Sequence, residues 1–118
     1  LSEVDHQLGR VWDALERSGH WDDTWILITS DHGEQLGDHG LVQKSGFFEG
    51  SYHVLGIARD PRHPDAHGSV VTHFTENVDV FPTRCGAIAM ATPAQCDGLP
   101  LPPFRRGKSP PWWRDAAH

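Results

Sequence analysis

The clearest hydrophobic pattern lies at the start of the chain, over residues 2–18. Apolar side chains recur there at steps of four, three, one and three, which places them on one face of a helix with 3.6 residues per turn. These residues are Val4, Leu8, Val11, Trp12 and Leu15. We expect Ser2 to cap this amphipathic helix, with Asp5 completing a weak capping box. Ser18 and Gly19 provide its stop signal.

The pattern then changes to short apolar runs that are typical of strands. Residues 24–29 have an unbroken apolar centre, which predicts a strand buried on both faces, as in a parallel sheet covered by helices. Residues 52–58 predict a second strand and residues 70–74 a short third one. The stretches 30–50 and 61–69 are rich in Gly, Pro and charged residues, so we interpret both as loops.

The last third of the chain is less regular. Asn77 or Asp79 can open a helix with Pro82 in its first turn, where the missing N–H costs little. The residues Arg84, Cys85 and Gly86 interrupt the apolar face that such a helix needs. From residue 93 to 118 prolines and glycines dominate, which predicts an irregular tail.

Composition limits the possible functions. A chain of 118 residues suffices for one small domain, and no apolar run approaches the roughly 20 residues of a membrane span. The net charge of −6 argues against nucleic-acid binding, since the one basic cluster, Arg105, Arg106 and Lys108, is small. Cys85 and Cys96 predict free thiols. The start at Leu1, inside a helical pattern and without an initiator Met, predicts a piece of a longer protein. No signal segment is visible in this piece, which leaves the compartment of the whole protein open, with a cytoplasmic location as the first expectation.

The candidate chemistry lies in residues 30–40 (SDHGEQLGDHG), directly after the first strand. In open α/β sheets, ligands bind beyond the carboxyl ends of the strands. Asp31 and His32 offer a hard oxygen and a borderline nitrogen ligand to a divalent cation. On these residues alone the pair is either a metal site or an ordinary turn cluster, because Asp and Gly favour turns. We interpret the second pair, Asp38 and His39, as a loop contact.

Several motifs in collinear order resemble the sulfatase family of the alkaline phosphatase superfamily. Particular similarities point to phosphonate monoester hydrolases, arylsulfatases and choline sulfatases. The motifs that carry the resemblance are VDHQLG at 4–9, TSDHGEQLGDHG at 29–40, Lys44, FFEGS at 47–51, TENVDVFPT at 75–83, QCDG at 95–98 and WRDAAH at 113–118.

The resemblance implies a fold, a site and a reaction. The fold would be α/β, a partial alkaline-phosphatase-like sheet sandwiched between helices, with residues 1–118 forming the C-terminal part of a catalytic domain. Asp31 and His32 would bind one divalent metal ion, calcium or manganese. Lys44 would be the catalytic and substrate-binding amine that holds the oxygens of a small-molecule sulfate or phosphonate ester. A cation and an ammonium group can both stabilise the charge that develops on those oxygens.

The family's nucleophile is missing from this chain. It arises from a Cys or Ser in a Cys/Ser-x-Pro-x-Arg motif, but Cys85 is followed by Gly-Ala-Ile and Cys96 by Asp-Gly-Leu. The N-terminal part of the family's domain would have to supply it, so the chain alone should be inactive. Gly56 and the prolines at 100–103 also depart from the family pattern. An alternative is therefore a degenerate, non-catalytic remnant with weak or no metal binding. A histidine-rich metal-binding module is disfavoured, because the nine histidines lack regular ligand spacing.

Overall fold

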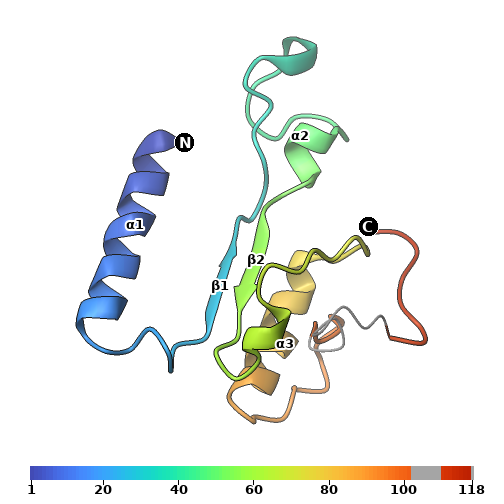
Figure 1. The fold of residues 1–118 in the computed structure, drawn as a ribbon. Helices are drawn as coiled ribbons and strands as arrows, with labels where there is room; N and C mark the ends of the chain where they lie inside the picture. The colour runs from blue at the N-terminus through green and yellow to red at the C-terminus, as the bar shows by residue number, and fades with distance from the viewer. Residues whose placement is uncertain (102–109, 118) are drawn as a thin grey trace.

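The computed structural model describes residues 1–101 and 110–117, which form a small mixed α/β unit. In Figure 1 the two strands lie centrally, with α1 to one side and α3 to the other. The described elements are helices α1 (Ser2–Arg17), α2 (Glu49–Tyr52) and α3 (Val80–Ala87), strands β1 (Ile26–Thr29) and β2 (Gly56–Arg59), and 3-10 turns η1 (Asp38–Gly40), η2 (Pro64–Ala66) and η3 (Asn77–Asp79).

Helix α1 confirms the amphipathic prediction, but its start differs. The carbonyl of Leu1 accepts the first helical hydrogen bond, from the N–H of Asp5 at 3.0 Å, so Leu1 is the N-cap and Ser2 already lies inside the helix. The end is as predicted. Gly19 has a φ of +75°, and its N–H donates to the carbonyl of Glu16 at 3.0 Å. Glycine adopts this left-handed conformation without the clash of a Cβ atom.

Trp21 connects α1 to the sheet. Its ring meets Trp12 of α1 edge-on, with 6.1 Å between ring centroids. The guanidinium of Arg59, at the end of β2, lies 4.3 Å from the centroid of the Trp21 ring and donates to the Trp21 carbonyl at 2.6 Å. A cation over an indole face is an attractive arrangement. This stack therefore fixes the connection between α1 and β1 against the neighbouring strand.

The sheet corrects the strand predictions in two respects. Within the described residues, β1 pairs with β2 in antiparallel register, from Ile26 opposite Arg59 to Thr29 opposite Gly56, so the predicted parallel arrangement is wrong for this pair. The second strand also begins later than predicted. Residues 49–52 form the helical turn α2 instead, because the N–H of Tyr52 donates to the carbonyl of Phe48 at 3.1 Å.

The predicted third strand, residues 70–74, is not formed. Val70 is 85% exposed, and in the described chain this stretch has no partner strand. The carbonyl of Phe74 instead accepts the indole N–H of Trp113 at 2.7 Å. The β-branched residues of the stretch 70–74 favour an extended backbone, but a strand also needs a neighbouring strand for its hydrogen bonds.

The predicted helix near Pro82 is confirmed as η3 followed by α3. Asn77 begins η3, and Pro82 is the third residue of α3, within its first turn. The expected interruption at residues 84–86 is wrong, since α3 continues to Ala87. Cys85 is buried, so the helix keeps a short covered face despite its glycine. Both cysteines are free.

Asp79 is a fully buried carboxylate that joins α3 to the C-terminal tail. One oxygen, Oδ1, accepts from the N–H of Leu99 at 2.8 Å and from Nη2 of Arg114 at 2.8 Å. The other, Oδ2, accepts from the N–H of Glu76 at 2.8 Å and from Nη1 of Arg114 at 2.6 Å. Four donors surround two oxygens, so the buried charge is paired and hydrogen-bonded, as burial requires. We call these contacts the Asp79–Arg114 hub.

Two neighbouring contacts bring the tail close to the helix at the hub. A Cβ atom at Gly98 would lie 2.0 Å from the carbonyl oxygen of Val78, so only glycine allows this approach. The hydroxyl of Thr83 donates to the Asp79 carbonyl at 2.6 Å and accepts from the N–H of Leu101 at 2.9 Å. The basic residues Arg105, Arg106 and Lys108, prolines 102 and 103, and His118 lie outside the described residues.

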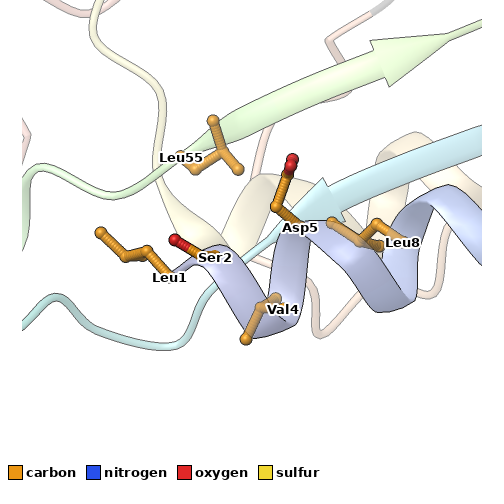
Figure 2. Close-up of a pocket in the computed structure, with 6 residues that line it drawn as sticks. All are labelled: Leu1, Ser2, Val4, Asp5, Leu8 and Leu55. Carbon is orange, nitrogen blue, oxygen red and sulfur yellow. The ribbon is translucent and has the colours of Figure 1, made fainter.

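A shallow pocket lies at the start of α1 (Figure 2). It is lined by Leu1, Ser2, Val4, Asp5, Leu8 and Leu55. None of the predicted site residues lines it, and its walls are mainly apolar. No helix in the described part of the chain is long and apolar enough to cross a bilayer.

We predict that Arg114→Ala lowers the free energy of unfolding by about 3–5 kcal/mol, because it leaves the Asp79 carboxylate buried without its charge partner. Urea unfolding followed by circular dichroism measures this change. The matched control is Arg17→Ala. The Arg17 side chain is exposed and lies 3.8 Å from Asp13, so its loss should change stability by less than about 0.5 kcal/mol. Equal effects of the two substitutions would contradict the role of the hub.

Candidate functional site

Asp31 and His32 follow β1 directly, because that strand ends at Thr29. The predicted turn therefore does begin at the carboxyl end of a strand. The Asp31 side chain is 88% exposed and that of His32 is 38% exposed, so both can be reached by a ligand. We call these two residues the Asp31–His32 pair.

The hydrogen bond of the His32 ring determines which ring nitrogen has a lone pair available to a metal ion. Nδ1 lies 2.8 Å from the carbonyl oxygen of Gly33. A carbonyl oxygen only accepts, so Nδ1 carries the proton and the neutral ring keeps its lone pair on Nε2. Metal-binding histidines commonly donate their second ring N–H to a backbone carbonyl in this way. The ring is thus held in a tautomer that suits metal binding through Nε2.

The carboxylate of Asp31 is oriented toward the same nitrogen. Its Oδ1 accepts the backbone N–H of His32 at 3.0 Å, and its Oδ2 lies 3.7 Å from Nε2 of His32. When two ligand atoms bind the same divalent cation, each lies about 2.0–2.3 Å from the metal. The two ligand atoms are then about 3–3.7 Å apart. The donor types and their separation fit one side of a metal centre.

This pair is not a complete coordination sphere. In residues 1–101 and 110–117, no group of three or more His, Cys, Asp or Glu side chains is arranged to hold a metal ion. A divalent cation needs four to six or more ligands. The described residues therefore hold no complete metal site by themselves.

Lys44 lies in the same loop and acts on the same carboxylate. The pKa of Asp31 is lowered below its ordinary value of 3.8, first by the hydrogen bond from the backbone N–H of His32 and then by the electrostatic influence of the His32 side chain. The ammonium of Lys44 contributes further to this lowering of the pKa. This effect of Lys44 on the pKa of Asp31 is smaller than that of His32.

The backbone just before Lys44 is held in a defined conformation. Gln43 has a φ of +62°, which is uncommon for a residue with a side chain. Its N–H donates to Oε1 of Glu34 at 2.5 Å, and its carbonyl accepts from the N–H of Gln35 at 2.9 Å. Glu34 thus has a structural role within this loop. These bonds tie Lys44 to the segment that follows the Asp31–His32 pair.

Gly33 anchors the downstream side of the pair, and sequence reasoning did not assign it this role. Its N–H donates to the carbonyl of Ser51 at 2.8 Å, and a Cβ atom would lie 2.0 Å from the Gly50 oxygen. The adjoining contact is a buried amide, since Nε2 of Gln35 donates to the hydroxyl of Ser51 at 2.7 Å. The glycine after a strand was the available signal, because glycine often marks a close approach of two backbones.

Asn77 braces the upstream side and was also missed. Its Nδ2 donates to the carbonyls of Ser30 and Asp31, each at 3.0 Å. Asn77 was interpreted only as a possible helix start, and this prediction is correct, but the side chain also reaches across to β1. Nothing in the local sequence pattern indicates a contact over 46 residues.

The Asp38–His39 pair does not join the site. The ring of His39 stacks on Phe48, with 4.0 Å between ring centroids and 14° between ring planes. His39 has a φ of +55° within η1. This pair therefore shapes the loop, as predicted.

Comparison with known proteins identifies the family of the chain. A family model described as Sulfatase matches residues 1–89. The protein PehA of Trinickia caryophylli, described as a multifunctional alkaline phosphatase superfamily protein, is 41% identical over 118 residues, covering all of this chain and 23% of the relative. The phosphonate monoester hydrolase of Agrobacterium radiobacter has a crystal structure that matches with a TM-score of 0.92 at 51% identity, covering 98% of this chain and 23% of that one.

A third match includes a bound substrate. The structure of BT4656 in complex with its substrate D-glucosamine-2-N,6-O-disulfate matches with a TM-score of 0.89 at 35% identity, over 97% of this chain and 23% of that one. Because the family model covers most of the sequence, the chain belongs to the sulfatase family. It spans about a quarter of the length of the relatives that it matches, or 23% of each of the three named here.

We predict that the Asp31 carboxyl titrates below pH 3.8 in the folded chain. A lowered folded-state pKa means that ionised Asp31 stabilises the fold above about pH 4 and that this contribution is lost as the pH falls through the lowered value. Carbon-detected NMR titration of the carboxyl measures the midpoint. Lys44→Gln should raise it, whereas Arg17→Gln, at the end of α1, should leave it unchanged. A midpoint at or above 3.8 would refute the described surroundings of Asp31.

Proposed function

We propose that this chain is part of a metal-dependent hydrolase of sulfate or phosphonate monoesters. In this proposal Asp31 and His32 hold one divalent metal ion, and Lys44 binds the substrate. The observation that supports it best is the His32 ring, whose Nδ1 is occupied by the Gly33 carbonyl while Nε2 faces the Asp31 carboxylate. An ordinary turn cluster does not require that arrangement of two donors.

Each residue has a chemical task in this reaction. A bound divalent ion supplies Lewis-acid stabilisation of charge on the ester oxygens. Asp31 contributes a carboxylate that is ionised at neutral pH, and the lowering of its pKa keeps it ionised to more acidic pH than an ordinary aspartate. His32 contributes a neutral nitrogen in a fixed tautomer. Lys44, as an ammonium, pairs with the non-bridging oxygens of the ester and with the charge that develops on the leaving oxygen.

The choice of metal follows from the ligand types. Carboxylate oxygens suit both calcium and manganese, whereas an imidazole ligand argues against a calcium site, which is built from oxygen ligands. The proposal allows calcium or manganese and favours manganese because His32 would be a ligand. The remaining ligands and the nucleophile would lie in the part of the catalytic domain outside this sequence, where the sheet sandwiched between helices would be completed.

The substrate class follows from the relatives. One of them is named for phosphonate monoesters, and another was solved with a sugar that carries two sulfate groups. Both substrates present a tetrahedral, anionic centre with exposed terminal oxygens, two in a phosphonate monoester and three in a sulfate ester or sulfamate. A cation next to an ammonium suits this shared chemistry, so we propose a small anionic ester as the substrate of the whole protein.

We predict weak manganese binding by the chain that depends on Asp31. Asp31→Ala removes one of two ligands and should reduce the affinity by at least about tenfold. Calorimetric titration with MnCl2 and with CaCl2 measures the affinity, and Asp13→Ala in α1 is a matched control for the loss of one exposed carboxylate. Equal manganese binding by the wild type and Asp31→Ala would refute the assignment. No binding to either metal would favour the alternative of a non-catalytic remnant.

We predict that Lys44 acts in catalysis once the missing domain is supplied. A chimera in which this chain replaces the matching part of the Agrobacterium radiobacter enzyme should hydrolyse a phosphonate monoester. Lys44→Met should then lower kcat by about 100–1,000-fold, because it removes a preorganised charge at the developing oxyanion. Arg17→Met, which changes an exposed cation of α1, is the control. An active chimera that tolerates Lys44→Met would contradict this role.

A further inference from the structure

The amide of Asn77 forms a clamp on the backbone that leads into the Asp31–His32 pair. Its Nδ2 donates to two successive carbonyl oxygens, those of Ser30 and Asp31, each at 3.0 Å. Its Oδ1 lies 3.4 Å from the hydroxyl of Thr29, which donates to it. One side chain thus engages three consecutive residues at the end of β1.

This clamp matters because little else fixes the Asp31 side chain. That side chain is 88% exposed, and its closest described partners are the neighbouring His32 and Ser30. Its position therefore depends on the direction of its own backbone. Downstream, Gly33 fixes the backbone through its bond to Ser51. Upstream, the two carbonyls that Asn77 holds set the orientation of the peptide groups on either side of Asp31.

The chemistry of the clamp requires an amide. Two carbonyl oxygens need two N–H donors, and the planar NH2 group of asparagine supplies both from one atom. Its neighbours hold Asn77 in place, because it begins η3 and the same turn ends at Asp79 in the Asp79–Arg114 hub. The clamp residue therefore belongs to the same turn as Asp79, whose carboxylate accepts four hydrogen bonds in the Asp79–Arg114 hub.

We propose that Asn77 is a positioning residue for the metal, acting through the backbone of Asp31 and not as a ligand itself. This inference rests on the proposed function of the Asp31–His32 pair. Asn77, at the start of η3, would thus orient Asp31 although the two residues lie 46 positions apart in the sequence. Loss of the clamp would leave both ligands present but less well oriented toward each other, and outer-shell residues of this kind commonly influence metal affinity.

The decisive variant is Asn77→Asp, measured in the full 118-residue chain. The carboxylate has nearly the shape of the amide but cannot donate to the carbonyls of Ser30 and Asp31. It also adds a negative charge, which by electrostatics alone would tighten cation binding. We expect the opposite result, an Mn²⁺ affinity about tenfold weaker than that of the wild type, toward the lower end of what outer-shell changes cause. Paramagnetic broadening of the Asp31 and His32 NMR signals by MnCl2 measures it.

Two further variants keep the result clear. Thr75→Asp places the same charge in the same exposed segment without touching the clamp, so the Mn²⁺ affinity should be unchanged or slightly tighter. If Asn77→Asp reduces the folded population in NMR spectra, Asn77→Ser serves instead. Its single hydroxyl donor adds no charge, and we expect an intermediate loss of about threefold.

The outcomes separate the two proposals. Wild-type broadening at Asp31 and His32 together with unchanged or tighter binding in folded Asn77→Asp would overturn the role of Asn77 and leave the metal site standing. Absence of Mn²⁺ broadening in the wild type would overturn the metal site and this inference with it. Weaker binding in Asn77→Asp and not in Thr75→Asp supports both.

Discussion

The buried Asp79–Arg114 ion pair is the interaction on which the rest of this structure depends. The described chain buries few apolar side chains completely, so its tail is held chiefly by hydrogen bonds to a single carboxylate. The pair raises the pKa of the Arg114 guanidinium, and Glu76 adds a second carboxylate 2.7 Å from the same group. A charge pair of this kind contributes to stability only when its partners are all present, since an unpaired buried charge is costly. The turn η3 links this ion pair to the candidate site, because its three residues include both Asp79 and Asn77.

The elements that could be predicted are those with a local cause. Helix α1 has a full amphipathic period and a glycine stop, and its range was correct to within one residue. Strand β1 and the turn after it were predicted from one apolar run followed by Asp31 and His32. The site residues could be named because their motifs resemble those of a known family. The family model and the matching structures bear out that resemblance, while the roles of the individual residues stay predictions.

The features that could not be predicted involve partners far apart in the sequence. Strand direction depends on which segments meet, and β1 meets β2 through a loop whose path the sequence does not define. Residues 70–74 have strand-forming side chains but no neighbouring strand in the described chain. Phe47 is a large apolar residue, yet it is 93% exposed and stacks on Tyr52. The long-range contacts of Asn77 and Arg114 could not be predicted, because an isolated polar residue has no periodicity from which its contacts could be inferred.

The bond from Asn77 to Asp31 also has a consequence for the order of events during synthesis. The two residues are separated by 46 positions, so the backbone after β1 emerges well before the side chain that clamps it exists. At about 5–20 residues per second, translation takes about 2–9 s to bridge that gap. During this interval the turn has only its downstream contacts with residues 43–51. In a nascent chain, Asp31 and His32 would thus be exposed before Asn77 is synthesised. The time at which the Asn77 hydrogen bonds form would then be limited by the rate of translation and not by local folding.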